Sequence, residues 1–113
     1  MQKYVFVVMT NARENRDEEY NDWCTNRHLP DMLRIPGFKA AQRFQLAKTQ
    51  RKDPPFPYKY MVHYEIETDD LGKSIATLNE WSGTDKMPST TSLHPDRLAY
   101  FFEPITKRMT RVD

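Results

Sequence analysis

The chain has 113 residues, of which 38% are hydrophobic and 29% charged, and its formal net charge at pH 7 is +1. This length is typical of one domain, so we expect residues 1–113 to form a single unit. The balanced charge removes the electrostatic basis for binding nucleic acid or a membrane surface, and no apolar stretch approaches the ~18 residues that cross a bilayer. The one cysteine, Cys24, allows no internal disulfide, which fits a reducing compartment, so we expect a cytoplasmic protein.

A strand and a helix are expected first. Residues 3–10, KYVFVVMT, are apolar on both alternating faces, which predicts a strand covered on both sides rather than a signal peptide. In the following NARENRDEEY, Asn15 can cap a helix, and Glu18 lies three residues later as in a capping box. Pro30 disfavours helical geometry in the residue before it, so we expect this helix to break or kink near His28.

Two further strands are expected around a loop. Residues 38–47 alternate, with Phe38, Ala40, Phe44 and Leu46 on one side and Lys39, Arg43 and Gln45 largely on the other. Residues 48–57, KTQRKDPPFP, are basic and rich in proline, which predicts an exposed loop. Residues 58–67 form the next strand, which alternates Tyr58, Tyr60, Val62, Tyr64 and Ile66 against Lys59, Met61, His63 and Glu65.

A second helix and a fourth strand complete the pattern. Thr68-Asp69-Asp70 offers caps for a helix that Gly83 would end, and residues 97–105, RLAYFFEPI, favour a strand. The order β-α-β-β-α-β is the ferredoxin-like split βαβ arrangement, an α+β fold. It predicts a four-stranded antiparallel sheet with both helices packed on one face.

Several strand residues are predicted to point away from the helices although they are apolar. They are Val5, Val7, Met9, Met61 and Phe101. An apolar face of this kind needs a partner. The simplest partner is a second copy of the chain, so we expect a homodimer in which two sheets face each other.

The stretch WCTNRHLPDMLRIPGF, residues 23–38, and its surroundings resemble a known superfamily. An N-terminal strand, a helix carrying Y-x-x-W, then H-x-P-x(5)-P-G-F and a strand are similar to the dimeric α/β-barrel superfamily, especially its EthD-like branch. The likeness extends through YEIETDD to the closing FEPIT. It implies a dimer whose two sheets close into a barrel, with a small cleft between sheet and helices in each subunit. Members include isomerases, cyclases, monooxygenases, haem-degrading enzymes and decarboxylases, and many use no cofactor, so the fold alone fixes little chemistry.

His28 is the candidate catalytic acid or base. It is expected at the C-terminal end of a helix, where the dipole favours the protonated form, and Asp31 could orient its ring or stabilise its charge. In several branches of the superfamily that the chain resembles, a histidine at the end of the first helix lies in the cleft, and His28 matches that position. The alternative interpretation is that His28 caps the last helix carbonyls and stabilises the bend before Pro30.

Cys24 lies one turn before His28, which raises the possibility of a Cys–His pair with a reactive thiolate. No Asn or Asp partner is identifiable, so a small packed residue is the favoured interpretation. The candidate substrate-binding residues are Tyr20, Trp23, Cys24, Tyr60, Tyr64 and Trp81, although aromatic residues could equally form an ordinary core. Tyr60 and Tyr64 are expected to reach into the cleft because an unpaired buried hydroxyl is costly.

These features favour a cofactor-independent isomerase, cyclase or lyase that transfers protons on a small, largely apolar, carbonyl-bearing or cyclic substrate. We expect no metal, because His28, His63 and His94 lack ligand spacing. Related haem degraders carry their iron ligand on the second helix, and DLGKSIATLNEW contains no histidine. An RNA-recognition motif would need glycine in its third strand. A non-catalytic binding or structural dimer stays open as the alternative, and a cofactor-free monooxygenase or haem-binding enzyme is less favoured.

Overall fold

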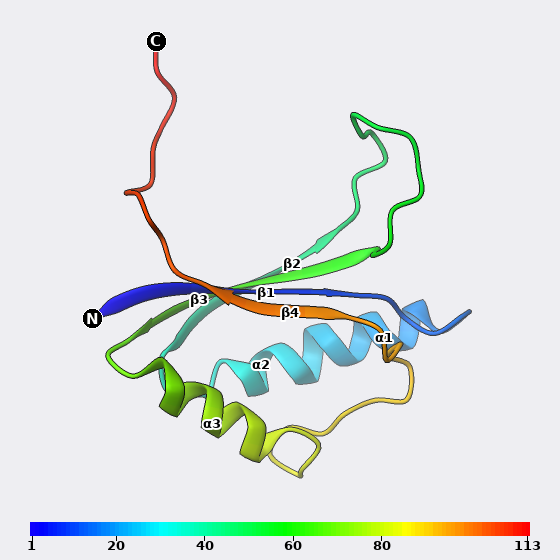
Figure 1. Ribbon diagram of the computed structural model, residues 1–113. Coiled ribbons are helices and arrows are strands. Elements are labelled where there is room, and N and C mark those ends of the chain that lie inside the picture. Colours follow the sequence, from blue (N-terminus) through cyan, green and yellow to red (C-terminus); the bar gives the residue numbers. More distant parts are fainter.

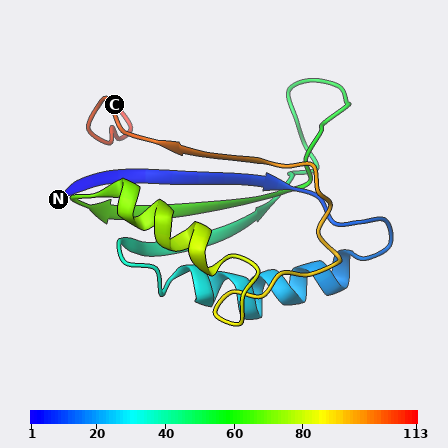
Figure 2. The same ribbon diagram turned by 60° about the horizontal axis from the view of Figure 1, so that its bottom comes forward.

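The protein has two layers in a computed structural model that describes residues 1–113 (Figure 1). One layer is an antiparallel sheet in the order β2-β3-β1-β4, built from β1 (Gln2–Thr10), β2 (Phe38–Gln45), β3 (Tyr60–Thr68) and β4 (Leu98–Phe102). The other layer is helical and consists of α1 (Asp17–Trp23), η1 (Cys24–His28), α2 (Leu29–Met32) and α3 (Leu71–Trp81). Figure 2 shows that both helical segments cover the same face of the sheet, which confirms the expected ferredoxin-like fold. No helix has the length and apolar character needed to cross a membrane.

The first helical segment runs from Asp17 to Met32, and its middle part, η1, is a π-helix. The Leu29 N–H donates to the Cys24 carbonyl, five residues earlier, where an α-helix would bond four residues back. This wider turn comes just before Pro30, whose ring would clash with a carbonyl in the regular helical ladder. The predicted break near His28 is therefore replaced by a π-helical turn, and the helix continues through Pro30.

The start of α1 differs from the predicted capping box of Asn15 and Glu18. Arg16 occupies the N-cap position without a side-chain cap, and Asn15 has a φ of 62°. This left-handed conformation suits asparagine and takes it out of the capping position. Acidic residues from Asp17 to Glu19 fill the first turn instead, where negative charge is favoured by the helix dipole.

The start of α3 agrees with the cap predicted from the sequence at Thr68-Asp69-Asp70. The Asp70 side chain accepts a hydrogen bond from the Lys73 backbone N–H at 3.1 Å, which satisfies one free donor of the first turn. Gly83, two residues beyond the end of α3, has a φ of 80°, a conformation that favours glycine.

A β-bulge between Phe38 and Ala40 decides which β2 side chains face the helices. Beyond the bulge, Arg43 pairs with the core residue Val62, and Phe44 lies on the opposite face. The prediction that Phe44 shares a face with Phe38 was wrong, because one extra residue inverts the alternation. Arg43 therefore points toward the helices, where its Nη2 donates to the Oδ1 of Asn21 at 2.7 Å and connects β2 to α1.

The hydrophobic core lies between the sheet and the helices. Tyr60, Val62, Tyr64 and Ile66 of β3 are all buried there, which confirms the predicted alternation of this strand. Its other members are Phe6, Tyr20, Cys24, Met32, Ile35, Phe38 and Met87.

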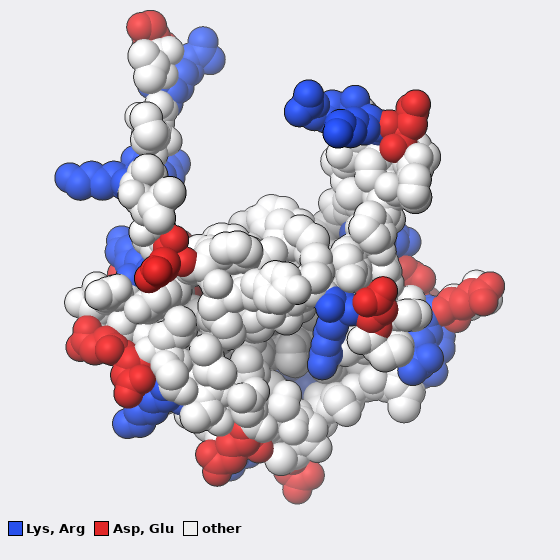
Figure 3. All heavy atoms as spheres, viewed as in Figure 1, with Lys and Arg blue, Asp and Glu red and all other residues white.

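The opposite face of the sheet is uncovered, and most of its central side chains are apolar. Figure 3 shows an uncharged surface here, between two charged arms: the β2–β3 loop and the residues that follow β4. The register places Val5, Val7, Met9 and Met61 on this open face, as predicted, together with Phe44, Leu98, Tyr100 and Phe102. Tyr100 and Phe102 are 58% and 52% exposed.

Phe101 was wrongly assigned to the open face. It pairs with Phe6 of β1, and the two rings stack with their centroids 4.0 Å apart on the helix side of the sheet. The strand β4 presents aromatic residues alternately to both faces, so apolar character alone does not decide which face Phe101 occupies.

Candidate functional site

Two adjoining cavities lie between the sheet and the helices, and we refer to them together as the cleft. The smaller, about 120 Å³, is bounded by α1, η1 and the segment between α3 and β4. The larger, about 290 Å³, lies between α3 and strands β1 and β4. Five residues border both cavities: Val8, His28, Tyr64, Ser82 and Arg97. The predicted catalytic histidine therefore lies where the two cavities meet.

His28 is a half-buried, neutral histidine at the end of η1. Its ring stacks on Trp23 with the centroids 4.5 Å apart, and its Nδ1 atom is buried without a hydrogen-bond partner. Burial lowers the pKa of His28 to about 4; the charge of Asp31 opposes this shift, and that of Arg97 adds to it. The expected preference for the protonated form is overturned, because desolvation outweighs the helix dipole.

Asp31 does not hold the His28 ring as predicted. Its carboxylate is 1% exposed and accepts a hydrogen bond from the Nε of Arg27 at 2.7 Å and another from Arg34. Each oxygen serves one arginine on the same helical segment, so no hydrogen bond from Asp31 orients the ring, although the charge of Asp31 does favour the protonated form of His28. Asp31 instead stabilises the turn around α2.

We therefore expect Asp31→Asn to destabilise the protein, because it removes the charge that the two arginines bind. Charge-assisted hydrogen bonds contribute about 1.5–3 kcal/mol each, and the half-exposed arginines recover part of this loss by rehydration. The free energy of unfolding, measured by urea denaturation, should fall by about 1–3 kcal/mol. Asp22→Asn is the matched control, since exposed Asp22 bonds only Asn26, and it should change stability by less than about 0.5 kcal/mol. Equal stabilities for the two variants would contradict this role for Asp31.

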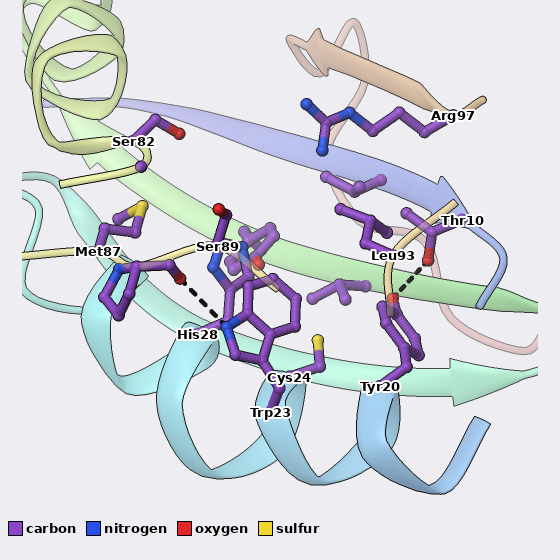
Figure 4. Close-up of a pocket in the computed structure, with 15 residues that line it drawn as sticks. Thr10, Tyr20, Trp23, Cys24, His28, Ser82, Met87, Ser89, Leu93 and Arg97 are labelled. Atoms are coloured by element: carbon purple, nitrogen blue, oxygen red, sulfur yellow. Dashed lines mark hydrogen bonds between the residues drawn. The ribbon is translucent and has the colours of Figure 1, made fainter. Parts of the chain in front are cut away.

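The three candidate tyrosines differ in where their hydroxyls lie. Tyr64 is 1% exposed and borders both cavities, and its hydroxyl bonds to no protein group; burial raises its pKa. Tyr20 borders the smaller cavity, but its hydroxyl lies 2.5 Å from the Oγ1 of Thr10 (Figure 4), and burial raises its pKa to about 12. Tyr60 donates to Asp17 at 2.6 Å and borders neither cavity. Only Tyr64 thus leaves a hydroxyl free for a ligand.

Trp23 and Cys24 line the smaller cavity, whereas Trp81 lines neither. The Nε1 of Trp23 donates to the Pro88 carbonyl at 3.1 Å and holds the segment after α3 against the cleft (Figure 4). Cys24 is buried, and burial raises the pKa of its thiol, which supports the packed interpretation over a reactive thiolate. The ring of Trp81 lies beneath the Lys86 ammonium, 5.4 Å away, outside the cleft.

The sequence of this chain matches one known protein family. The model of one family, "Domain of unknown function (DUF4286)", matches residues 3–81, which is most of the chain. The chain belongs to the DUF4286 family. The matched range runs from β1 to the end of α3 and includes His28 and Tyr64. Among curated proteins, none matches the sequence of this DUF4286 member.

Two solved structures share the fold of this DUF4286 chain. The "Putative antibiotic biosynthesis monooxygenase" from Nitrosomonas europaea is 14% identical with a TM-score of 0.60, over 94% of this chain and 93% of that one. An ethyl tert-butyl ether D (EthD) family protein from Bacillus halodurans C-125 is 12% identical with a TM-score of 0.51, over 93% and 100%. At these identities the likeness concerns the fold alone. At that level it confirms the expected ferredoxin-like fold.

The DUF4286 chain also carries cleft residues that the sequence analysis missed. The segment between α3 and β4 contributes Ser82, Gly83, Met87, Pro88, Ser89 and Leu93. Arg97 precedes β4 and borders both cavities. Figure 4 shows its side chain extending from the start of β4 across β1. The alternation of RLAYFF could have indicated Arg97, because it shares a face with Phe101, but Phe101 was assigned to the wrong face.

The other two histidines lie away from the cleft. His63 faces the open side of the sheet, as predicted, and the Nδ1 of His94 accepts the Asp96 backbone N–H at 3.0 Å. No group of three or more His, Cys, Asp or Glu side chains is placed to hold a metal ion.

Proposed function

We propose that the cleft binds a small, largely apolar, carbonyl-bearing or cyclic molecule and that His28 transfers a proton to or from it without a cofactor. The observation that carries this proposal is the His28 ring, which borders both cavities while no protein group bonds its nitrogens. Buried polar groups without partners are rare and costly, and they concentrate at functional sites. A bound molecule would supply a partner for Nε2, the nitrogen that the protein leaves accessible.

The chemistry would be divided between His28 and Tyr64. A neutral imidazole is the form that accepts a proton, and its pKa rises when negative charge develops on a substrate beside it. Nε2 is the nitrogen that the protein does not bury, so it would exchange the proton. The free hydroxyl of Tyr64 would donate a hydrogen bond to the substrate oxygen. These roles are those of an isomerase, cyclase or lyase.

The walls of the cleft support an apolar substrate. Apolar side chains from the sheet, from α3 and from the segment after it supply most of the lining: Phe6, Val8, Val62, Ile75, Leu78, Met87, Leu93 and Phe101. Small-molecule sites commonly combine such walls with a few polar groups that fix orientation. His28 and Tyr64 would be two of those groups.

We further propose that the protein acts as a homodimer joined through its open sheet faces. The apolar residues of that face, among them Val7 and Tyr100, have no cover within one chain. The two projecting arms rise beside this face and would flank the second copy (Figure 3). A two-fold interface of this kind leaves the cleft of each subunit on the far side of its sheet.

A cofactor-free monooxygenase is the second candidate, favoured by the name of one structural neighbour, an antibiotic biosynthesis monooxygenase. In that case His28 would deprotonate a CH2 carbon of the substrate, and the carbanion would add dioxygen and a proton to give a hydroperoxide. Loss of water from the hydroperoxide would leave a carbonyl group at that carbon. The two candidates share the first step and differ in whether oxygen is consumed.

Proton transfer can be tested by hydrogen exchange in D2O. Enolisable ketones such as 2-tetralone and phenylacetone would be incubated with the protein while proton NMR follows loss of the α-proton signals. We expect exchange at least about 100-fold faster than with buffer alone, the lower end of general acid–base catalysis. His28→Gln should abolish the acceleration, whereas His94→Gln, at an exposed residue that borders neither cavity, should retain it.

The outcomes separate the candidate functions. Acceleration that consumes oxygen would select the monooxygenase. Ketones that bind the cleft without faster exchange in the wild-type protein would contradict catalysis and leave the binding protein.

A further inference from the structure

Arg97 is the only charged residue that borders the cleft, and it has no partner. No Asp, Glu or Lys lines either cavity. Arg97 precedes β4 on the same side of the sheet as Ala99 and Phe101, yet its guanidinium forms no hydrogen bond or ion pair with the protein. The exposed guanidinium therefore borders a mainly apolar space and has no acceptor within the protein.

The acidic residues near Arg97 are occupied elsewhere. Asp96, its chain neighbour, accepts a hydrogen bond from the Tyr58 hydroxyl at 3.4 Å. Asp31, whose charge reaches His28, is bound by two other arginines. Neither carboxylate forms an ion pair with Arg97, so an anion from outside the protein could bind it.

Arg97, His28 and Tyr64 come from three different elements and border the same two cavities. Figure 4 shows Arg97 extending from the strand side and His28 rising from the helix side of the smaller cavity. The charge of Arg97 adds to the lowering of the His28 pKa that burial causes. A ligand held by Arg97 would therefore lie beside His28.

We propose that the ligand of the cleft is a small carboxylic acid with an apolar or cyclic body, whose carboxylate binds Arg97 while its body lies between α3 and the sheet. A planar carboxylate matches the guanidinium fork with two parallel hydrogen bonds. A single carboxylate on the ligand would neutralise the single positive charge of Arg97. The apolar side chains of the other walls would pack against the body of the ligand. This inference rests on the ligand-binding part of the proposed function and adds the class of substrate.

The test compares matched acids and amides that differ in charge and hardly in shape. Phenylacetate and phenylacetamide, and cyclohexanecarboxylate and cyclohexanecarboxamide, would be titrated into 15N-labelled protein. Amide shifts of residues around the cleft would report binding. We expect each acid to bind at least about tenfold more tightly than its amide in low salt, and this preference should shrink as ionic strength rises.

Arg97→Gln should remove the preference for acids, and Arg97→Lys should keep part of it, because lysine retains the charge without the fork. Arg13→Gln is the matched control, since Arg13 is exposed and borders neither cavity. Exposed Arg97 has no protein partner, so urea denaturation should show unchanged stability in its variants.

Three results would overturn the inference. Acids and amides that bind the wild-type cleft equally would refute the carboxylate class and leave cleft binding intact. A preference that survives Arg97→Gln would refute the role of Arg97. Failure of every acid and amide to bind would overturn both this inference and the proposed binding of small molecules in the cleft.

Discussion

Lowering the pH from 7 to 4 should destabilise the wild-type protein by about 3 kcal/mol more than a His28→Gln variant. The pKa of His28 is about 4 in the folded protein and 6.5 in its ordinary state. Between these values the unfolded chain binds a proton that the folded protein does not, so the stability falls as the pH decreases. Each pH unit in this window corresponds to about 1.4 kcal/mol, which gives the expected total.

Urea denaturation at several pH values between 4 and 7 measures this difference. The comparison uses the pH dependence of each protein, so an effect of the substitution that is constant with pH cancels. His94→Gln is the control, because His94 is exposed in the segment before β4 and borders neither cavity, and it should keep the full wild-type slope. Equal slopes for wild type and His28→Gln would show that His28 is not held in the neutral form by burial.

Val7→Glu should convert a dimer into a monomer. Val7 lies on the open face of β1, a central strand of the sheet, and is flanked by His63 of β3 and Tyr100 of β4. A carboxylate in the middle of a sheet-to-sheet interface would be buried twice around the two-fold axis without a partner. We expect the dissociation constant to rise at least about 100-fold, equivalent to about 3 kcal/mol.

Sedimentation velocity over a range of concentrations measures the oligomeric state. The wild-type protein should sediment with twice the chain mass of 13.5 kDa, and Val7→Glu should sediment as a single chain. Ala76→Glu places the same charge on the exposed surface of α3 and should leave the dimer intact. A wild-type protein that stays monomeric at high concentration would contradict the proposed use of the open face.

The elements of this fold could be predicted from the sequence because their signals are local. The strand period of two is uninterrupted in β3, so Tyr60 and Tyr64 were placed on the correct face. The Asp70 cap of α3 likewise depends on residues within one turn. The order of the elements then left the ferredoxin-like arrangement as the natural way to cover one face of the sheet.

Features that depend on irregular backbone were not predictable in this way. The bulge in β2 inverted the alternation and brought Arg43 to the helix side, and the π-helical turn carried the helix through Pro30. Neither has a distinctive residue pattern, because each is a shift of register within an otherwise regular element.

The cleft was predictable only in part because it depends on distant segments. His28 could be proposed from its position, but its lowered pKa results from burial under other elements. The sequence suggested Asp31 as its partner from proximity alone, whereas Arg27 and Arg34 lie closer to the carboxylate. Arg97 is far from His28 in the sequence, and only the pairing of β4 with β1 brings it to the same cavities.

The decisive measurement is a crystal structure of the protein with one of the titrated acids or ketones. We expect the molecule to lie between the sheet and α3, with an oxygen within about 3 Å of the Nε2 of His28. A ligand bound elsewhere on the protein while the cleft stays empty would contradict the account. So would a ligand that fills the cleft without touching His28.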